Sequence, residues 1–152
     1  MRVEKDFVEF CESLNANGIE YLIVGGFALG HHGAPRYTQD LDVFVNPSRQ
    51  QFARLCVALD QFGGFKIPQD WEELGERILE LGIAPIQFHV MSSISGVTWD
   101  EAWASRSPGV YGPVQVNYIG LQMLVKNKEA SGRDKDRADV KRLRRRAPGD
   151  GA

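Results

Sequence analysis

Apolar residues recur along the chain at two spacings, one typical of helices and the other typical of strands. The helical spacing begins near the N-terminus, at four positions: Phe7, Phe10, Cys11 and Leu14. It predicts an amphipathic helix that ends at Asn17-Gly18. Further helices are predicted from a start signal at residues 46–48 to the glycine pair at 63–64, over 99–104, and in two final segments divided at 131–132.

Strands are predicted where short apolar runs alternate with polar residues or end at turn residues. These runs cover residues 21–24, 38–45, 77–83, 86–91 and 114–118. Pro85 separates the third run from the fourth, because proline cannot donate a hydrogen bond to a sheet. The order of elements predicts a single α/β (α+β) domain, a mixed, twisted sheet flanked by helices, over residues 1–147. We expect the tail at 148–152 to be disordered.

Composition indicates an ordinary globular protein, with 152 residues, 43% hydrophobic and 25% charged. The net charge of -2 gives no overall attraction to nucleic acid, so any site for a polyanion must be local. No apolar run has the length of a membrane span or resembles a signal peptide. Cys11 and Cys56 fall in helical patterns and are expected to be buried thiols rather than a disulfide. We therefore expect a soluble, cytoplasmic protein without membrane partners.

Two carboxylates, Asp40 and Asp42, are the first candidate for chemistry. They are spaced i, i+2 on a predicted strand, so they project from one face while Leu41 and Val43 pack on the other. Adjacent acids repel each other unless a cation lies between them, and oxygen ligands suit Mg²⁺ or Mn²⁺. A solvated turn at the start of the strand is the alternative interpretation.

The glycine pair Gly25-Gly26 follows the first predicted strand. Glycine leaves no side chain between backbone N–H groups and an approaching anion, which favours a phosphate-binding turn; a plain tight turn into a helix is the alternative. Arg36 and Thr38 lie between this turn and the acids and are candidates to meet a triphosphate. We expect the nearby His31-His32 pair to cap or pack rather than to bind zinc.

A family resemblance rests on these residues. Glycines after a strand, followed by Asp-x-Asp on the next strand, resemble the nucleotidyltransferase superfamily that includes DNA polymerase beta, and within it the small prokaryotic members found in toxin–antitoxin and abortive-infection systems. A second match is the segment 128–139, which resembles the helical Lys, Arg and Asp cluster of that family. The resemblance implies a nucleotidyltransferase-like fold, an NTP substrate, and Mg²⁺ or Mn²⁺ bound by Asp40 and Asp42.

His89 departs from the pattern of this family. A third carboxylate often stands on a later strand of these enzymes, and the matching position here is His89. Histidine suits Mg²⁺ poorly, so the resemblance implies an Mn²⁺ preference, a catalytic base at His89, or weakened catalysis. A histidine that only packs within the sheet is the remaining interpretation.

The C-terminal cluster supplies candidate phosphate ligands. Helical geometry lets only one of Lys126 and Lys128 face the site, and the family match favours Lys128, together with Arg133. Asp136 and Asp139 are expected to orient these bases rather than to bind metal. Ser131 with Asp134 predicts a capping box for the last helix, and the basic run at 141–146 predicts either a nucleic-acid contact or a solvated face.

Together these features predict a nucleotidyltransferase that moves a nucleoside monophosphate from an NTP to a hydroxyl acceptor: RNA, a protein or a small molecule. His89 favours an alternative, a catalytically weak or inactive nucleotide-binding module that acts through a partner protein, such as one half of a toxin–antitoxin pair. A third interpretation is a nucleic-acid-binding domain that uses the basic C-terminal helix. The acidic net charge disfavours it.

Overall fold

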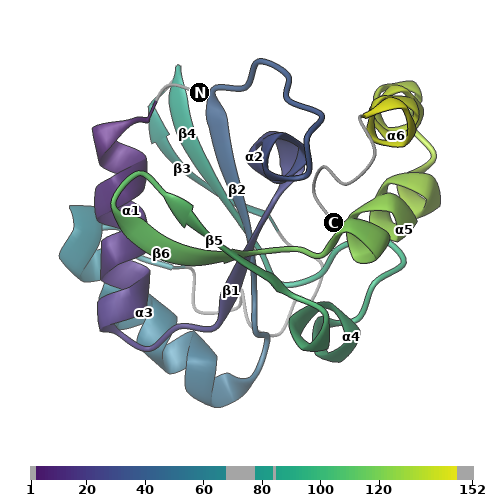
Figure 1. The fold of residues 1–152 in the computed structure, drawn as a ribbon. Coiled ribbons are helices and arrows are strands. Elements are labelled where there is room, and N and C mark those ends of the chain that lie inside the picture. The colour runs from purple at the N-terminus through teal and green to yellow at the C-terminus, as the bar shows by residue number, and fades with distance from the viewer. Residues whose placement is uncertain (1–2, 68–77, 84, 147–152) are drawn as a thin grey trace.

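The computed structural model describes residues 3–67, 78–83 and 85–146, which form one mixed sheet flanked by helices (Figure 1). The helices are α1 (Lys5–Ala16), α2 (Gly25–His31), α3 (Arg49–Gly63), α4 (Trp99–Ala104), α5 (Leu121–Ser131) and α6 (Asp134–Arg145). The strands are β1 (Tyr21–Val24), β2 (Asp40–Val45), β3 (Ile78–Ile83), β4 (Ile86–Met91), β5 (Ser107–Tyr111) and β6 (Val114–Tyr118). The α+β fold with a mixed sheet is as predicted.

The strand order in the sheet is β3-β4-β2-β1-β6-β5. The central strands β1 and β2 are antiparallel, and each has a parallel partner on its outer side, β6 and β4 respectively. The edge strands β3 and β5 run antiparallel to their neighbours. This topology places the glycine turn after β1 and the acids of β2 side by side in the middle of the sheet.

The two faces of the sheet are covered by different helices. Figure 1 shows α1 and α3 on one side, with α4, α5 and α6 on the other. Phe10 of α1 packs on Phe88 of β4 with ring centroids 4.8 Å apart, whereas Phe44 of β2 packs on Trp99 of α4 at 5.1 Å. Leu41 and Val43 are fully buried and alternate with the half-buried acids, so the predicted division of β2 into two faces is confirmed.

The ends of α1 and α3 match their sequence signals. Ser48 is the N-cap of α3, and its hydroxyl accepts a hydrogen bond from the Gln51 backbone N–H at 3.3 Å. The same helix ends at Gly64, whose φ of 70° is left-handed. Gly18, with a φ of 67°, follows α1 in the same way.

Three elements differ from the prediction. The glycine turn continues as helix α2, which the two leading glycines hide because glycine is a poor helix former. Strand β5 contains Pro108 and Gly109, which argue against a strand in general but are tolerated at the sheet edge that β5 occupies. Strand β2 begins at Asp40 rather than at Thr38. Arg77 of the third predicted strand and the predicted tail lie outside the described residues.

Cys11 is buried as predicted, whereas Cys56 is only half-buried, and no disulfide joins them. No helix in the described part of the chain combines the length and apolar character that a membrane crossing needs.

Candidate active site

Gly25 and Asp42 are packed against each other. Gly25 starts α2 with a φ of +68°, and a Cβ built on it would lie 2.2 Å from Oδ2 of Asp42. The turn therefore requires glycine for two reasons, its left-handed backbone and the carboxylate that lies over it. A Cβ on Gly26 would instead meet Thr38, 2.8 Å from its Cβ. The glycine pair thus packs against two of the predicted site residues.

Strand register places a row of polar residues beside the acids. Asp40 is opposite Gln87 of β4, and Asp42 is opposite His89. The Nδ1 atom of His89 lies 2.9 Å from Oδ1 of Asp42, and the two side chains are 22% and 23% exposed. Asp40, Asp42 and His89 are therefore neighbours on one face of the sheet, as the resemblance implied.

His89 is held in a strongly acidic environment. The hydrogen bond to Asp42 raises the pKa of His89, because it favours the imidazolium; burial opposes this effect, and the charges of Asp42, Asp40 and Glu80 add to it. Its Nε2 atom is buried and has no hydrogen-bond partner among the described residues. The imidazole is thus oriented through Nδ1 alone.

Glu80 is the residue near the site that sequence reasoning missed. It is exposed on β3 and opposite His89, so Asp42, His89 and Glu80 form one row across three strands. The signal was present in the sequence. A hairpin closed between residues 83 and 86 places residue 80 opposite residue 89.

Helices α5 and α6 contribute a buried ionic cluster. The Lys128 ammonium is buried and lies 3.2 Å from Oδ1 of Asp136 and 3.0 Å from Oδ2 of Asp139. Asp139 also accepts a hydrogen bond from Nε of Arg36 at 3.1 Å. Asp139 therefore joins α6 both to α5 and to the segment between α2 and β2. The two aspartates orient bases, as predicted.

Asp136 is the other buried carboxylate of this cluster. Burial raises its pKa, but hydrogen bonds from Ser131, Arg133 and Lys128 outweigh burial and hold the pKa at about 2. Nε of Arg133 lies 2.8 Å from Oδ2 of Asp136. The predicted capping box of Ser131 is wrong. The N-cap of α6 is Arg133 without a side-chain cap, and the Ser131 hydroxyl bonds Asp136 instead.

One cavity of about 390 Å³, which we call the site cavity, collects most of the predicted residues. Its lining includes five of them: Gly25, Arg36, Asp42, Lys128 and Arg133. Lys135 and Asp136 also line it, together with the apolar side chains of Met91 and Ile94. The cavity thus combines cations, carboxylates and apolar side chains. Lys126 does not line it, because its ammonium pairs with Glu101 at 3.1 Å.

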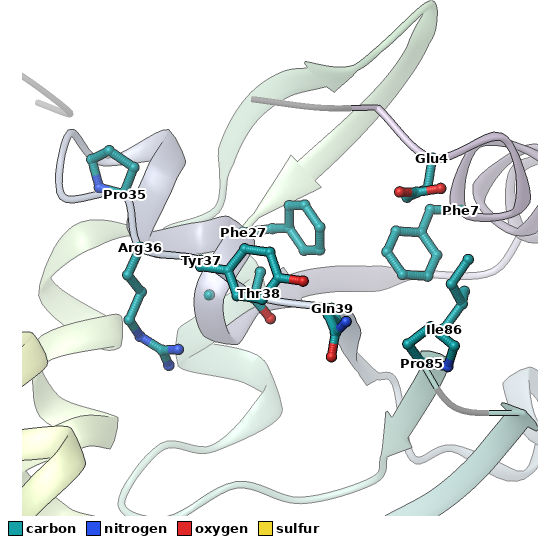
Figure 2. A pocket seen from close by; sticks show the side chains of 11 residues that line it. Glu4, Phe7, Phe27, Pro35, Arg36, Tyr37, Thr38, Gln39, Pro85 and Ile86 are labelled. Atoms are coloured by element: carbon teal, nitrogen blue, oxygen red, sulfur yellow. The ribbon is translucent and has the colours of Figure 1, made fainter.

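Two other predicted residues, Gly26 and Thr38, line a separate cavity of about 510 Å³, the side pocket. Figure 2 shows this pocket between Phe7 of α1, Phe27 of α2 and the segment 35–39. Arg36 lines both cavities, and Figure 2 shows its guanidinium pointing away from the aromatic rings of the pocket. Segment 35–39 is therefore the wall between the two cavities.

The histidine pair has a packing role, as predicted. His31 stacks on Tyr118 with ring centroids 4.1 Å apart, and its Nε2 lies 2.8 Å from the Ser107 hydroxyl. His32 is buried, with Nε2 2.7 Å from the Ile119 carbonyl oxygen.

The donor set beside the glycine turn fits a divalent metal that arrives with a nucleotide. No group of three or more His, Cys, Asp or Glu side chains in the described part of the chain forms a ready metal site. Mg²⁺ is commonly held by one or two carboxylates together with substrate phosphates and water, and seldom by a cage made of protein alone. Asp40 and Asp42 supply that many carboxylates, and Asp42 lines the same cavity as the cations Arg36, Lys128 and Arg133.

Comparison with protein-family models and with curated proteins gives no match. Solved structures do match. The lincosamide antibiotic adenylyltransferase LnuA, bound to lincomycin, has a TM-score of 0.63 at 14% identity, with 93% of this chain and 96% of that chain covered. A nucleotidyltransferase candidate from Thermotoga maritima has a TM-score of 0.60 at 10% identity, over 92% and 93% of the two chains. ANT(2″)-Ia in complex with adenylyl-2″-tobramycin has a TM-score of 0.53 at 11% identity, over 90% and 84%. This chain therefore has the fold of the nucleotidyltransferases.

Proposed function

We propose that the protein is a metal-dependent nucleotidyltransferase that moves a nucleoside monophosphate from an NTP to a hydroxyl acceptor. One observation carries the proposal: a glycine turn, the Asp42 carboxylate and the buried Lys128 ammonium line the same cavity, although they come from three separate parts of the chain. Nucleotidyl transfer needs little covalent chemistry from the protein and much positioning of charge, which such a cavity provides.

In this proposal the triphosphate binds the cations of the cavity, Arg36, Lys128 and Arg133, and the base packs on its apolar side chains. The buried aspartates hold Arg36 and Lys128 in fixed positions, so these cations need no reorganisation when phosphate binds. Asp40 and Asp42 would hold Mg²⁺ or Mn²⁺, which supplies neutralisation of phosphate charge when bound. His89 orients the Asp42 carboxylate through Nδ1.

Removing either carboxylate tests the proposal. Asp40→Asn and Asp42→Asn should each abolish metal-dependent NTP binding, measured by calorimetry with and without Mg²⁺. Asp134→Asn is the matched control, because this aspartate is fully exposed on α6 and does not line the site cavity. Transfer from each α-labelled NTP to components of a cell lysate should fall by orders of magnitude in the same two variants, at about 1.4 kcal/mol per tenfold. Equal metal–nucleotide affinity in wild type and both variants would refute the assignment.

His89 supports a second candidate, a nucleotide-binding module with weak or no transfer that acts through a partner protein, for example in a toxin–antitoxin pair. The resemblance assigns a third carboxylate to this position, and here the imidazole Nδ1 lies 2.9 Å from an Asp42 oxygen that the proposed metal ion would otherwise use. Metal-dependent NTP binding without labelling of any lysate component, in wild type and in a His89→Asp variant, would favour this candidate.

A further inference from the structure

Positive charge is concentrated at one end of the chain, although the protein as a whole is acidic. Residues 133–146 carry eight of the 18 Lys and Arg residues but only three of the 20 Asp and Glu residues. Six of these eight cations are arginines. An acidic protein with one strongly basic segment has a local, not a general, attraction for polyanions.

Most cationic side chains of helix α6 are exposed to solvent. Its buried residues are Asp136, Asp139, Val140 and Leu143. Both buried acids are neutralised by the buried Lys128, the partly exposed Arg36 and the exposed Arg133, so they do not cancel the charge of the other cations. The outer face is defined by six exposed cations: Lys135, Arg137, Lys141, Arg142, Arg144 and Arg145. Two ion pairs neutralise part of it, Arg137 with Asp134 at 3.6 Å and Arg144 with Glu129 at 3.4 Å.

This outer face is continuous with the site cavity. Lys135, at the start of α6, lines the cavity, and so does Arg133 just before it. Arg142 lies seven residues after Lys135 and therefore on the same side of the helix, where it donates a hydrogen bond to the Pro35 carbonyl. A helix rises 1.5 Å per residue, so this side of α6 extends about 10 Å from Lys135 to Arg142. It begins at the lining of the site cavity.

An exposed aromatic ring lies on the segment that Arg142 contacts. Tyr37 is 81% exposed, the most exposed of the large hydrophobic side chains described. It lies two residues after Pro35, which Arg142 contacts, and one residue after Arg36, which lines both cavities. Figure 2 shows its ring at the edge of the side pocket. Single-stranded nucleic acids are bound by this combination of a cationic groove with aromatic rings on which bases stack.

We propose that the outer face of α6 and Tyr37 bind a single-stranded RNA, and that a terminal hydroxyl of this RNA is the nucleotide acceptor. The acceptor half rests on the proposed function, whereas the binding half stands without it. Arginine-rich charge matches phosphate, to which guanidinium groups bond bidentately, and a stacking ring matches a base, which an acidic protein partner lacks. In the transfer step the RNA 3′-oxygen bonds to the α-phosphorus of the NTP. The bond from that phosphorus to pyrophosphate breaks, and the hydroxyl proton leaves to solvent.

The binding half is tested by fluorescence anisotropy with a 5′-fluorescein-labelled single-stranded RNA of 20 nucleotides, without NTP or metal. With three phosphate contacts, affinity should fall about 20-fold between 50 and 200 mM salt. The double variant Lys141→Glu with Arg145→Glu should bind at least tenfold more weakly, with a salt slope reduced by about 1.4. The matched control is Arg49→Glu with Arg54→Glu on α3, which changes net charge equally on the other side of the sheet (Figure 1). The control should retain RNA affinity within a factor of two or three.

Several outcomes overturn the binding half. An equal loss in the α3 control would reduce the effect to net charge, and unchanged binding in the α6 variant would remove the surface from consideration. If the charge-reversed protein fails to fold, the double variant Lys141→Gln with Arg145→Gln replaces it in the same measurement. Tyr37→Ala should weaken binding at least fivefold while Tyr37→Phe retains it; equal affinities in both would exclude stacking. A polyglutamate peptide that competes as well as RNA, or a DNA of the same sequence that binds tenfold more tightly, would refute RNA as the partner.

The acceptor half is measured separately, by extension of the same RNA with α-labelled NTP and Mg²⁺ or Mn²⁺. RNA longer by one or more nucleotides, absent with Asp42→Asn, is the expected product. RNA that binds through α6 but is never extended, while another lysate component is labelled, would overturn the acceptor half alone. No labelling of any component, with RNA binding intact, would instead count against the proposed function.

Discussion

Asp139→Asn is the substitution that should disturb the candidate site most without touching the proposed metal ligands Asp40 and Asp42. Asp139 is 2% exposed and accepts from two cations, Nε of Arg36 at 3.1 Å and Nζ of Lys128 at 3.0 Å. Asparagine keeps the shape but removes the negative charge. Breaking a buried ion pair costs about 3–5 kcal/mol, because one charge is left uncompensated. Lys128 retains Asp136 and Arg36 is partly exposed, so we expect the lower limit, about 3 kcal/mol.

Urea denaturation followed by circular dichroism measures this loss. With a slope of about 2 kcal/mol per molar urea, a loss of about 3 kcal/mol lowers the midpoint by about 1.5 M. Asp134→Asn is the control, since its carboxylate is fully exposed and 3.6 Å from Arg137, and no measurable shift is expected. A double-mutant cycle with Arg36→Met then isolates the Arg36–Asp139 coupling. Wild-type stability in Asp139→Asn would refute the view that this residue neutralises the buried Lys128 and the partly exposed Arg36.

Three further substitutions test the sheet side of the site. Gly25→Ala should lose both stability and metal–nucleotide binding, because its Cβ would displace Asp42. The control is Gly64→Ala, which has a similar φ and open space around it; its free energy of unfolding should fall by only about 1 kcal/mol in the same urea titration. Asp42 raises the pKa of His89 above 6.5, so the protonated imidazole stabilises the fold fully below that pH. This stabilisation is lost as the pH rises through the folded-state pKa. The difference in urea midpoint between wild type and His89→Gln should therefore shrink between about pH 6 and 9. A constant difference across that range would exclude this linkage. His89→Asp adds an oxygen donor opposite Asp42 and should increase Mg²⁺ affinity in calorimetry; an unchanged affinity would place residue 89 outside the metal's reach.

Local sequence patterns predicted those helices and strands whose bounds are set by their own residues. Tyr21–Val24, Ile86–Met91 and Trp99–Ala104 have the bounds that apolar spacing and turn residues indicated. Strand β5 could not be predicted in this way, because Pro108 and Gly109 are acceptable only at a sheet edge, and the edge is defined by the whole topology. The same limit applies to α2, which starts with two glycines.

The candidate site also has one feature that local spacing predicted and one that it could not predict. Placing Asp40 and Asp42 on one face needed only the two-residue period of a strand, and the structure confirms it. The pairing of Arg36 with Asp139 spans 103 residues and has no local signature. Sequence reasoning therefore named Arg36 as a candidate phosphate ligand but could not predict that a carboxylate of α6 already holds it.

The bond between Arg36 and Asp139 also has a consequence for the order in which the protein is made. Arg36, Gly25 and the acids of β2 leave the ribosome early, whereas Lys128 and Asp139 come more than 80 residues later. Until α6 is synthesised, Arg36 has no carboxylate to hold it and the site cavity lacks one wall. Contacts so distant in sequence also form late in folding, since loop closure must precede them. If the proposed function holds, the nascent chain should be unable to bind nucleotide until α6 has docked.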